Sequence, residues 1–225
     1  MKTVIFDLDG TLADTSGDLI AAANACFTGL GLGPLLDPAT DAGTALRGGR
    51  AMLKLGFSRV DGYGEDEIDR QYPILLKAYG DNIDRYTVLY PGAMAAVEEL
   101  KKRGYGVGIC TNKPEGLADF LLTKLGVRGV FDALVGADTL PVRKPDPAPL
   151  FETARRLGGD PKQTCLIGDS DTDRNTARAA GVPSVLVTFG PSGEDMAALR
   201  PEALLDAYSD LPDLIDRLLD DTQTD

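Results

Sequence analysis

Five short apolar runs recur along the chain, and most of the segments between them have the spacing of amphipathic helices. The runs are TVIFDL near residue 3, YGVGIC at 105, FDALVGA at 131, TCLIGD at 164 and SVLVTF at 184. Short apolar runs of this kind are typical of strands that are buried on both faces, as in parallel sheets. Strands that alternate with helices build an α/β fold, because the helices cover the faces of the sheet. The pattern therefore predicts a doubly wound α/β core around a parallel sheet.

The stretch from residue 15 to residue 87 breaks this alternation. It contains several helical segments, such as TSGDLIAAANACFTGLG and GEDEIDRQYPILLKAYGDNIDRY, and no convincing strand. Pro73 lies inside the second of these segments, where a proline can kink or interrupt a helix. The sequence therefore predicts two domains: an α/β core of residues 1–14 and 88–225, and an all-helical insertion of residues 15–87 after the first strand.

The composition excludes several kinds of chemistry and of partner. The 225 residues include no histidine, which excludes Ser-His-Asp and Cys-His catalysis and histidine-ligated zinc. The formal net charge is −12 and the basic residues are scattered, so we expect no nucleic-acid partner. No run approaches the roughly 18 apolar residues of a membrane span, so we expect a cytoplasmic protein with no membrane partner. The three cysteines have no metal-ligand spacing, and we expect buried thiols.

Two aspartates, Asp7 and Asp9, come directly after the first predicted strand, in the sequence DLDGT. Side chains alternate across a strand, so these two carboxylates point the same way and share a small volume. Two like charges in one volume cost free energy unless a cation or a shared proton relieves the repulsion. The same letters also suit a solvated Asp-Gly turn at a strand end, and the rest of the chain has to decide between the two interpretations.

Polar side chains also follow the other predicted strands. Thr111 and Asn112 follow YGVGIC, Asp169 and Asp173 follow TCLIG, and Lys144 begins the proline-rich stretch KPDP between two strands. Each has an ordinary interpretation by itself, as a helix start, an N-cap cluster or a surface lysine. In an open parallel sheet, however, ligands bind where the carboxyl ends of the strands meet. Together these residues predict one site, with carboxylates around a cation such as Mg²⁺ and hydroxyl, amide and lysine donors around a phosphate.

The order of these motifs, DLDGT, then TN, then KPDP, then GDSDTD, resembles the four-motif pattern of the haloacid dehalogenase (HAD) superfamily over nearly the whole chain. Within that superfamily, YPGAMAAVEELKKRGYGVGICTNKP and ARAAGVPSVLVTFG are similar to the phosphoglycolate phosphatase group, as is the helical insertion between the first two motifs. The resemblance implies a Rossmann-like core and a mobile helical cap. It also implies a Mg²⁺-dependent phosphatase for a small phosphorylated metabolite, with 2-phosphoglycolate as the expected substrate.

The resemblance further implies a role for each motif residue. Asp7 would be the nucleophile that forms an aspartyl-phosphate, and Asp9 the general acid and base. Thr111, Asn112 and Lys144 would bind the phosphate, and Lys144 would also steady the nucleophile. The chemistry is consistent with this, because a covalent intermediate divides one difficult displacement into two easier ones. An acid two residues away can protonate the departing alkoxide and then take a proton from water.

The magnesium ligands implied by the resemblance are Asp7, the backbone carbonyl of Asp9, and Asp169. Asp173 matches the second acid of the last motif, which is either a direct ligand or a support for the ligands. Lys113 lies next to the TN motif but lacks a strand-end position of its own, and we expect it to contribute less than Lys144.

Two other functions stay open on the sequence. A phosphomutase of the β-phosphoglucomutase type shares nearly every one of these core residues, but it needs a sugar bisphosphate for turnover. A phospho-accepting signalling module also uses clustered acids, a threonine and a lysine, but it is typically half this length and has no helical insertion. The namesake dehalogenases lack the second aspartate, so Asp9 favours phosphate chemistry. Both a monomer and a homodimer are compatible with the sequence.

The first prediction concerns the choice of substrate. Arg47 and Arg50 flank two glycines in LRGGRAML, inside the expected cap, and are either readers of a substrate carboxylate or solvated arginines. We expect Arg50→Ala or Arg47→Ala to raise KM for 2-phosphoglycolate about tenfold or more, which corresponds to one charged contact. Steady-state kinetics should show a much smaller change for p-nitrophenyl phosphate, which has no carboxylate. Equal losses on both esters would indicate impaired cap closure or folding instead.

Overall fold

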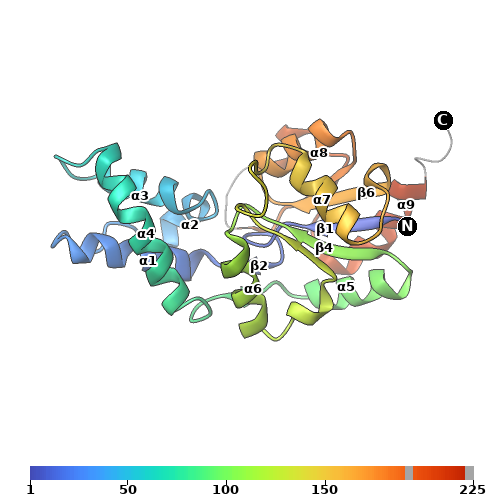
Figure 1. Ribbon diagram of the computed structural model, residues 1–225, viewed down its shortest axis with the longest axis horizontal. Helices are drawn as coiled ribbons and strands as arrows, with labels where there is room; N and C mark the ends of the chain where they lie inside the picture. The colour runs from blue at the N-terminus through green and yellow to red at the C-terminus, as the bar shows by residue number, and fades with distance from the viewer. Residues whose placement is uncertain (191–194, 221–225) are drawn as a thin grey trace. The chain divides into compact units, whose positions relative to one another are not determined.

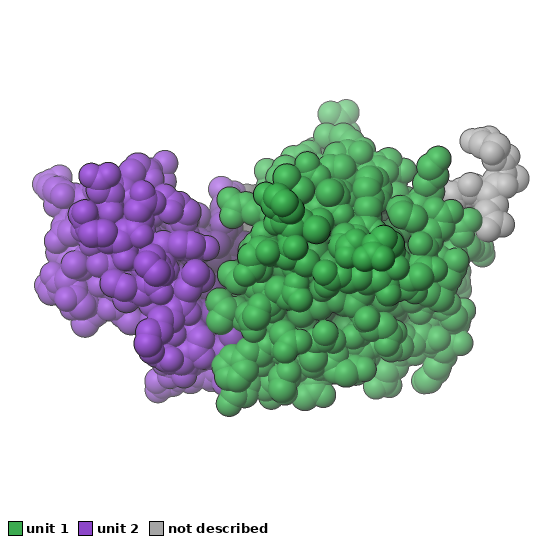
Figure 2. All heavy atoms as spheres, viewed as in Figure 1, with its two compact units in different colours: residues 1–13, 89–190, 194–225 green, residues 14–88, 191–193 purple. Residues whose placement is uncertain are grey.

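The computed structural model describes residues 1–190 and 195–220. These residues divide into two compact units (Figure 2). The first unit holds Met1–Ala13, Leu89–Gly190 and the described residues from 195 onward, and the second holds Asp14–Val88. We retain as a proposal that residues 1–14 and 88–225 form a catalytic core and residues 15–87 a cap domain. Residues 191–194 and 221–225 of that core lie outside the described part of the chain.

The first unit is built around a parallel sheet with the strand order β5-β4-β1-β6-β7-β8. The strands are β1 (Thr3–Phe6), β4 (Gly106–Cys110), β5 (Ala133–Val135), β6 (Thr164–Gly168), β7 (Ser184–Val187) and β8 (Ala203–Leu205). Every residue of β1 is buried because the strand has a neighbour on each side and helices on both faces. This position explains the uninterrupted apolar run in the sequence.

Helices cover both faces of this sheet (Figure 1). On one face lie α7 (Ala148–Arg156) and α8 (Asp171–Ala180), and on the other α5 (Ala93–Lys102), α6 (Glu115–Lys124) and α9 (Leu211–Asp220). Short 3₁₀ helices complete the described part of this unit: η1 (Arg128–Val130), η2 (Pro161–Gln163), η3 (Met196–Leu199) and η4 (Tyr208–Asp210). The predicted doubly wound α/β core is confirmed.

Strand β1 is the point at which the connections of the sheet reverse direction. The chain leads from β1 to β4 and β5 on one side, and then crosses back to β6, β7 and β8 on the other. Since all these strands are parallel, the segments that follow β1, β4 and β6 meet at one edge of the sheet. Ligands of open α/β sheets bind at such a reversal point.

A tight turn follows β1. The N–H of Gly10 donates to the carbonyl of Ala13 (2.9 Å), and the N–H of Leu12 donates to the carbonyl of Leu8 (3.0 Å). Gly10 has a φ of 79°, a left-handed conformation that glycine adopts without steric cost. The hydroxyl of Tyr208 donates to the carbonyl of Thr11 (2.6 Å) and ties this turn to the start of η4.

Asp14–Val88 contains helices α1 (Ser16–Gly29), α2 (Pro38–Ala45), α3 (Gly49–Phe57) and α4 (Glu65–Asp81). Helix α4 runs through Pro73, so the proline does not interrupt it. Two short strands, β2 (Ala13–Asp14) and β3 (Val88–Leu89), pair where the chain leaves and re-enters the first unit. Two residues are too few to give a recognisable strand pattern in the sequence.

Contacts among three aromatic rings help pack α1 against α3 in the second unit. The rings of Phe27 and Phe57 meet edge to face, with centroids 5.1 Å apart, and Tyr63 stacks on Phe57 at 5.0 Å. The Phe27 ring packs directly against Gly56, where a larger residue would not fit. A Cβ atom at Gly56 would lie 2.2 Å from the end of that ring.

We therefore expect Gly56→Ala to destabilise the protein. Overpacking of this kind costs about 1–3 kcal/mol, and at a contact of 2.2 Å we expect this cost to exceed the gain of about 1 kcal/mol in helix propensity. Urea unfolding measures the difference. Gly29→Ala is the matched control, because a Cβ atom there would have nothing within 4 Å, and we expect a change of about 0.5 kcal/mol or less. Equal effects of the two substitutions would contradict the packing around Phe27.

Candidate active site

Asp7 extends β1 by one residue into the edge of the sheet where the strand ends meet. Its N–H donates to the carbonyl of Ile167 in β6 (2.8 Å), which fixes the direction of the side chain. Its carboxylate accepts a hydrogen bond from the N–H of Leu8 (2.8 Å) and lies 3.2 Å from the Nζ atom of Lys144. The first predicted strand-end aspartate therefore has the predicted lysine beside it.

Asp7 also belongs to a cluster of three acids. Asp7, Asp169 and Asp173 each offer a carboxylate oxygen within 4.8 Å of the other two. The hydroxyl of Thr11 donates to Asp169 (3.0 Å), and the hydroxyl of Ser170, the N-cap of α8, donates to Asp173 (2.6 Å). The loops after β1 and β6 thus hold the three carboxylates in place.

The glycine at the end of β6 makes this arrangement possible. A Cβ atom at Gly168 would lie 2.4 Å from the Cβ and Cγ atoms of Asp173. The N–H of Asp169 donates to Asp173 Oδ2 (3.2 Å), the oxygen that also accepts from Ser170. The absence of a side chain at Gly168 therefore lets α8 bring Asp173 against the end of the strand.

The electrostatics of the cluster are unfavourable without a cation. Burial raises the pKa of Asp7 to about 6, and Asp173 and Asp9 add to the shift, although Lys144 opposes it. Burial also raises the pKa of Asp169, to which the neighbouring Asp173 and Asp7 contribute. Carboxylate oxygens gathered in this way are the donor set that hard divalent cations prefer. The residues present therefore fit a divalent metal ion.

Lys144 lies in the same cluster, and its side chain is 1% exposed. Its Nζ atom is 2.6 Å from Asp173 Oδ1 and 3.2 Å from Asp7 Oδ1. Burial disfavours the charged form of this lysine, but the two aspartates more than compensate and raise its pKa. Lys144 is therefore a buried ammonium, and one positive charge does not balance three carboxylates.

The segment after β4 supplies the other predicted residues. Thr111 is buried, and its hydroxyl accepts a hydrogen bond from the N–H of Lys113 (3.1 Å). The side chain of Asn112 donates to the carbonyl of Lys144 (3.0 Å), which links the segment after β4 to the KPDP stretch. That Thr111 and Asn112 bind phosphate stays a prediction.

Lys113 contacts the second strand-end aspartate. Its Nζ atom lies 2.7 Å from Asp9 Oδ1 and 2.9 Å from Asp9 Oδ2. The sequence predicts a lesser role for this lysine than for Lys144, because it lacks a strand-end position of its own. Only the strand order reveals that the long side chain of Lys113 reaches the loop after β1.

Residues 1–181 match the family model described as haloacid dehalogenase-like hydrolase. The chain belongs to the haloacid dehalogenase-like hydrolase family. A protein named phosphoglycolate phosphatase from Rhodospirillum rubrum is 39% identical over 216 residues, which cover 94% of this chain and 90% of that protein. One of the same name from Mesorhizobium japonicum is 37% identical over 218 residues, 96% of each chain. Among solved structures, a crystal structure titled a predicted phosphoglycolate phosphatase from Haemophilus somnus 129PT has a TM-score of 0.84 at 27% identity and covers 95% of this chain and 97% of that one.

These findings confirm the family that the motifs indicated, and the names of the relatives support a phosphatase. No helix in residues 1–190 and 195–220 is long and apolar enough to cross a membrane.

The two arginines expected in the cap of this HAD-like hydrolase lie in the second unit. Arg47 and Arg50 are both exposed. The guanidinium of Arg50 lies 2.7 Å from Asp69, 3.6 Å from Glu65 and 5.8 Å from the centre of the Tyr72 ring. Exposed ion pairs contribute little free energy, so these contacts do not prevent Arg50 from exchanging partners. That either arginine reads a substrate carboxylate stays a prediction.

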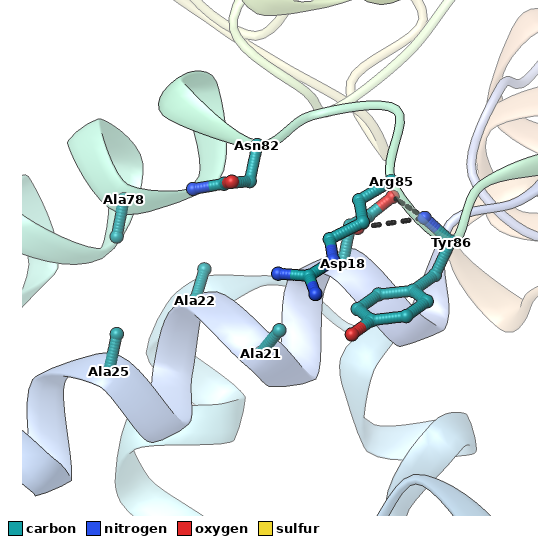
Figure 3. A pocket seen from close by; sticks show the side chains of 8 residues that line it. All are labelled: Asp18, Ala21, Ala22, Ala25, Ala78, Asn82, Arg85 and Tyr86. Carbon is teal, nitrogen blue, oxygen red and sulfur yellow. Dashed lines mark hydrogen bonds between the residues drawn. The ribbon is translucent and has the colours of Figure 1, made fainter.

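A pocket of about 190 Å³ lies within the second unit, between α1 and the end of α4 (Figure 3). It is lined by Asp18, Ala21, Ala22, Ala25, Ala78, Asn82, Arg85 and Tyr86. The carboxylate of Asp18 is already engaged, because it accepts hydrogen bonds from the N–H groups of Tyr86 and Thr87. None of the predicted site residues lines this pocket.

Charge repulsion in the acid cluster should lower the stability of the protein when no cation is bound. In the presence of chelator, we expect Asp7→Asn to raise the free energy of unfolding at pH 7 by about 1–3 kcal/mol. The pKa of Asp7 is raised from 3.8 to about 6, so the native state favours the protonated acid. The wild-type protein therefore loses stability relative to the variant as the pH rises through about 6, and the difference should vanish near pH 4. Urea unfolding from pH 4 to pH 8 measures it.

The control for this measurement is Asp171→Asn, which removes an exposed acid at the first residue of α8. We expect it to change the stability by about 0.5 kcal/mol or less at every pH. A pH-independent difference between Asp7→Asn and the wild-type protein would contradict the electrostatic account of the cluster.

Proposed function

We propose that this HAD-like hydrolase is a Mg²⁺-dependent phosphatase that converts 2-phosphoglycolate into glycolate and phosphate. The observation that carries the proposal is the placement of Asp7. It combines a strand-end carboxylate, the buried ammonium of Lys144 at 3.2 Å and an acid cluster suited to a cation. Relatives named phosphoglycolate phosphatase, at 37% and 39% identity over nearly the whole chain, support the choice of substrate.

Asp7 and Asp169, with the backbone carbonyl of Asp9, would hold the magnesium ion. Asp173 completes the acid cluster, but its two oxygens already accept hydrogen bonds from Lys144 and Ser170. These contacts favour Asp173 as a support for the ligands and for Lys144. When bound, the cation would neutralise charge on the phosphoryl oxygens and on the nucleophile.

In the first half of the proposed reaction, a carboxylate oxygen of Asp7 attacks the phosphorus atom. The bond between phosphorus and the glycolate oxygen breaks, and Asp9 gives its proton to the departing alkoxide. Lys144, Thr111 and Asn112 hold the phosphoryl group in line with the nucleophile. This positioning matters because most of the barrier reduction in phosphoryl transfer comes from orientation and charge stabilisation.

In the second half, a water molecule gives a proton to Asp9 and attacks the phosphorus atom of the aspartyl-phosphate. The bond between phosphorus and Asp7 breaks, phosphate leaves, and both aspartates return to their starting states. The absence of histidine from the sequence leaves carboxylates as the groups that can exchange protons with substrate near neutral pH.

Phosphate release from a panel of esters tests this function. The panel comprises 2-phosphoglycolate, sugar phosphates, nucleotides and pyrophosphate, and we expect multiple turnovers with 2-phosphoglycolate in Mg²⁺ and no sugar bisphosphate. Asp7→Asn should abolish turnover, since the amide is no nucleophile. Chelator should abolish it too, and Ca²⁺ should inhibit because its looser coordination misplaces the reacting groups.

The control is again Asp171→Asn, which should leave phosphate release almost unchanged because Asp171 is exposed and lies outside the acid cluster. Turnover that depends on a sugar bisphosphate would indicate a phosphomutase. A single turnover with no phosphate release would indicate a phospho-accepting module. Full activity in chelator, or in Asp7→Asn, would contradict the proposal.

A further inference from the structure

Asp7 and Asp9 lie two residues apart on the same loop, yet each contacts a different lysine. Lys144 contacts Asp7 within the acid cluster. Lys113 contacts both carboxylate oxygens of Asp9, at 2.7 Å and 2.9 Å. The two ion pairs come from different segments, since Lys113 follows β4 and Lys144 lies between β5 and α7.

The contact between Lys113 and Asp9 is partly buried, and the lysine is the more enclosed of the two residues. The side chain of Lys113 is 4% exposed and that of Asp9 is 15% exposed. Removing an ammonium group from water is costly unless a carboxylate in good geometry compensates for it. The ammonium group of Lys113 meets this condition, because it donates to both carboxylate oxygens of Asp9. Exposed ion pairs on a protein surface, by contrast, exchange partners freely.

The main chain of Lys113 is fixed on both sides, so the lysine has a defined position before it meets Asp9. Its N–H donates to the hydroxyl of Thr111 (3.1 Å), and its carbonyl accepts from the N–H of Ala137 (2.9 Å). Because β4 pairs with β1 in parallel, the segments after the two strands run side by side. The lysine is therefore held by the segments that follow β4 and β5, while its side chain reaches the loop after β1.

Asp9 is not part of the acid cluster that could hold a cation. Within the described part of the chain, the acids close enough to share a cation are Asp7, Asp169 and Asp173. The carboxylate of Asp9 lies outside that group, although Asp9 is next but one to Asp7. A carboxylate beside a divalent cation would otherwise be drawn toward it, and would then be lost to proton transfer.

We propose that Lys113 is a positioning residue that holds the carboxylate of Asp9 away from the metal cluster and in place for proton transfer. The inference rests on the proposed function, in which Asp9 exchanges protons with the leaving group and with water. Proton transfer requires heavy atoms within about 2.6–3.2 Å, and a displacement of about 1 Å can cost about a hundredfold in rate.

Two esters whose leaving groups differ in their need for a proton can separate a positioning role of Lys113 from a purely structural one. Glycolate departs as an alkoxide that needs a proton, whereas p-nitrophenolate departs without one. The measurement is kcat/KM for 2-phosphoglycolate and for p-nitrophenyl phosphate, each in Mg²⁺, because kcat/KM reports the steps up to the departure of the leaving group. Lys113→Met should lower kcat/KM about 10- to 100-fold for 2-phosphoglycolate and about threefold or less for p-nitrophenyl phosphate.

Two further variants sharpen the test. Asp9→Asn alone should show the same preference between the esters, and the Asp9→Asn, Lys113→Met double variant should match Asp9→Asn within about threefold, because Lys113 acts through Asp9. Lys162→Met, which changes an exposed lysine, should leave both esters unaffected. If thermal melting shows that Lys113→Met does not fold, Lys113→Arg replaces it, because arginine keeps the positive charge. The readout is then a loss of kcat/KM that is larger for 2-phosphoglycolate than for p-nitrophenyl phosphate.

Equal losses of kcat/KM on the two esters would overturn the inference, and so would losses that multiply in the double variant. Either result would indicate that Lys113 binds the phosphate or supports the fold. An unchanged rate in the folded Lys113→Met or Lys113→Arg variant, with Asp9→Asn impaired, would also overturn it and leave the proposed function intact. An unimpaired Asp9→Asn variant would overturn the proposed role of Asp9 itself, so the two failures are distinguishable.

Discussion

Repulsion among three carboxylates, two buried and one partly buried, at one edge of a parallel sheet governs the rest of the site. Asp7, Asp169 and Asp173 come together because parallel strands end at the same edge, and burial there raises the pKa of Asp7 to about 6. The groups around them offset this repulsion: the ammonium of Lys144 and the hydroxyl of Thr11 both donate into the cluster. The fold thus keeps an unfavourable arrangement that a cation would relieve, which is typical of functional sites.

In the proposed reaction the two strand-end aspartates have different tasks, and their neighbours differ accordingly. Asp7 lies in the acid cluster with Lys144, which suits a nucleophile whose charge is shared with a cation. Asp9 lies outside that cluster and is paired with Lys113. Differences of environment, rather than of residue type, separate nucleophile from acid and base in many enzymes that rely on carboxylates.

Much of this arrangement could be predicted from the sequence because the parallel sheet turns linear order into proximity. Residues that follow successive apolar runs meet at one edge, so Asp7, Lys144 and Asp169 could be grouped from their letters. The contact between Lys113 and Asp9 could not, because it depends on β4 lying beside β1. The strand β8 gives no clear pattern in the sequence, because it is short and only its last residue is buried. In the insertion, helical periodicity predicts helices but does not show which polar side chains face a substrate.

The position of β1 in the sheet also bears on the order in which the chain can acquire its structure during synthesis. The strand that leads to the proposed nucleophile Asp7 is made before its two partners, which begin at residues 106 and 164, so it emerges from the ribosome long before either neighbour exists. The helices of residues 16–81 are complete before either partner is made, and their contacts are local by comparison. Until β6 is made, the apolar face of β1 has no finished sheet to join. For this chain, the sheet edge that carries Asp7 therefore depends on contacts between segments far apart in the sequence, and contacts of that kind form slowly and leave apolar surface exposed until they do.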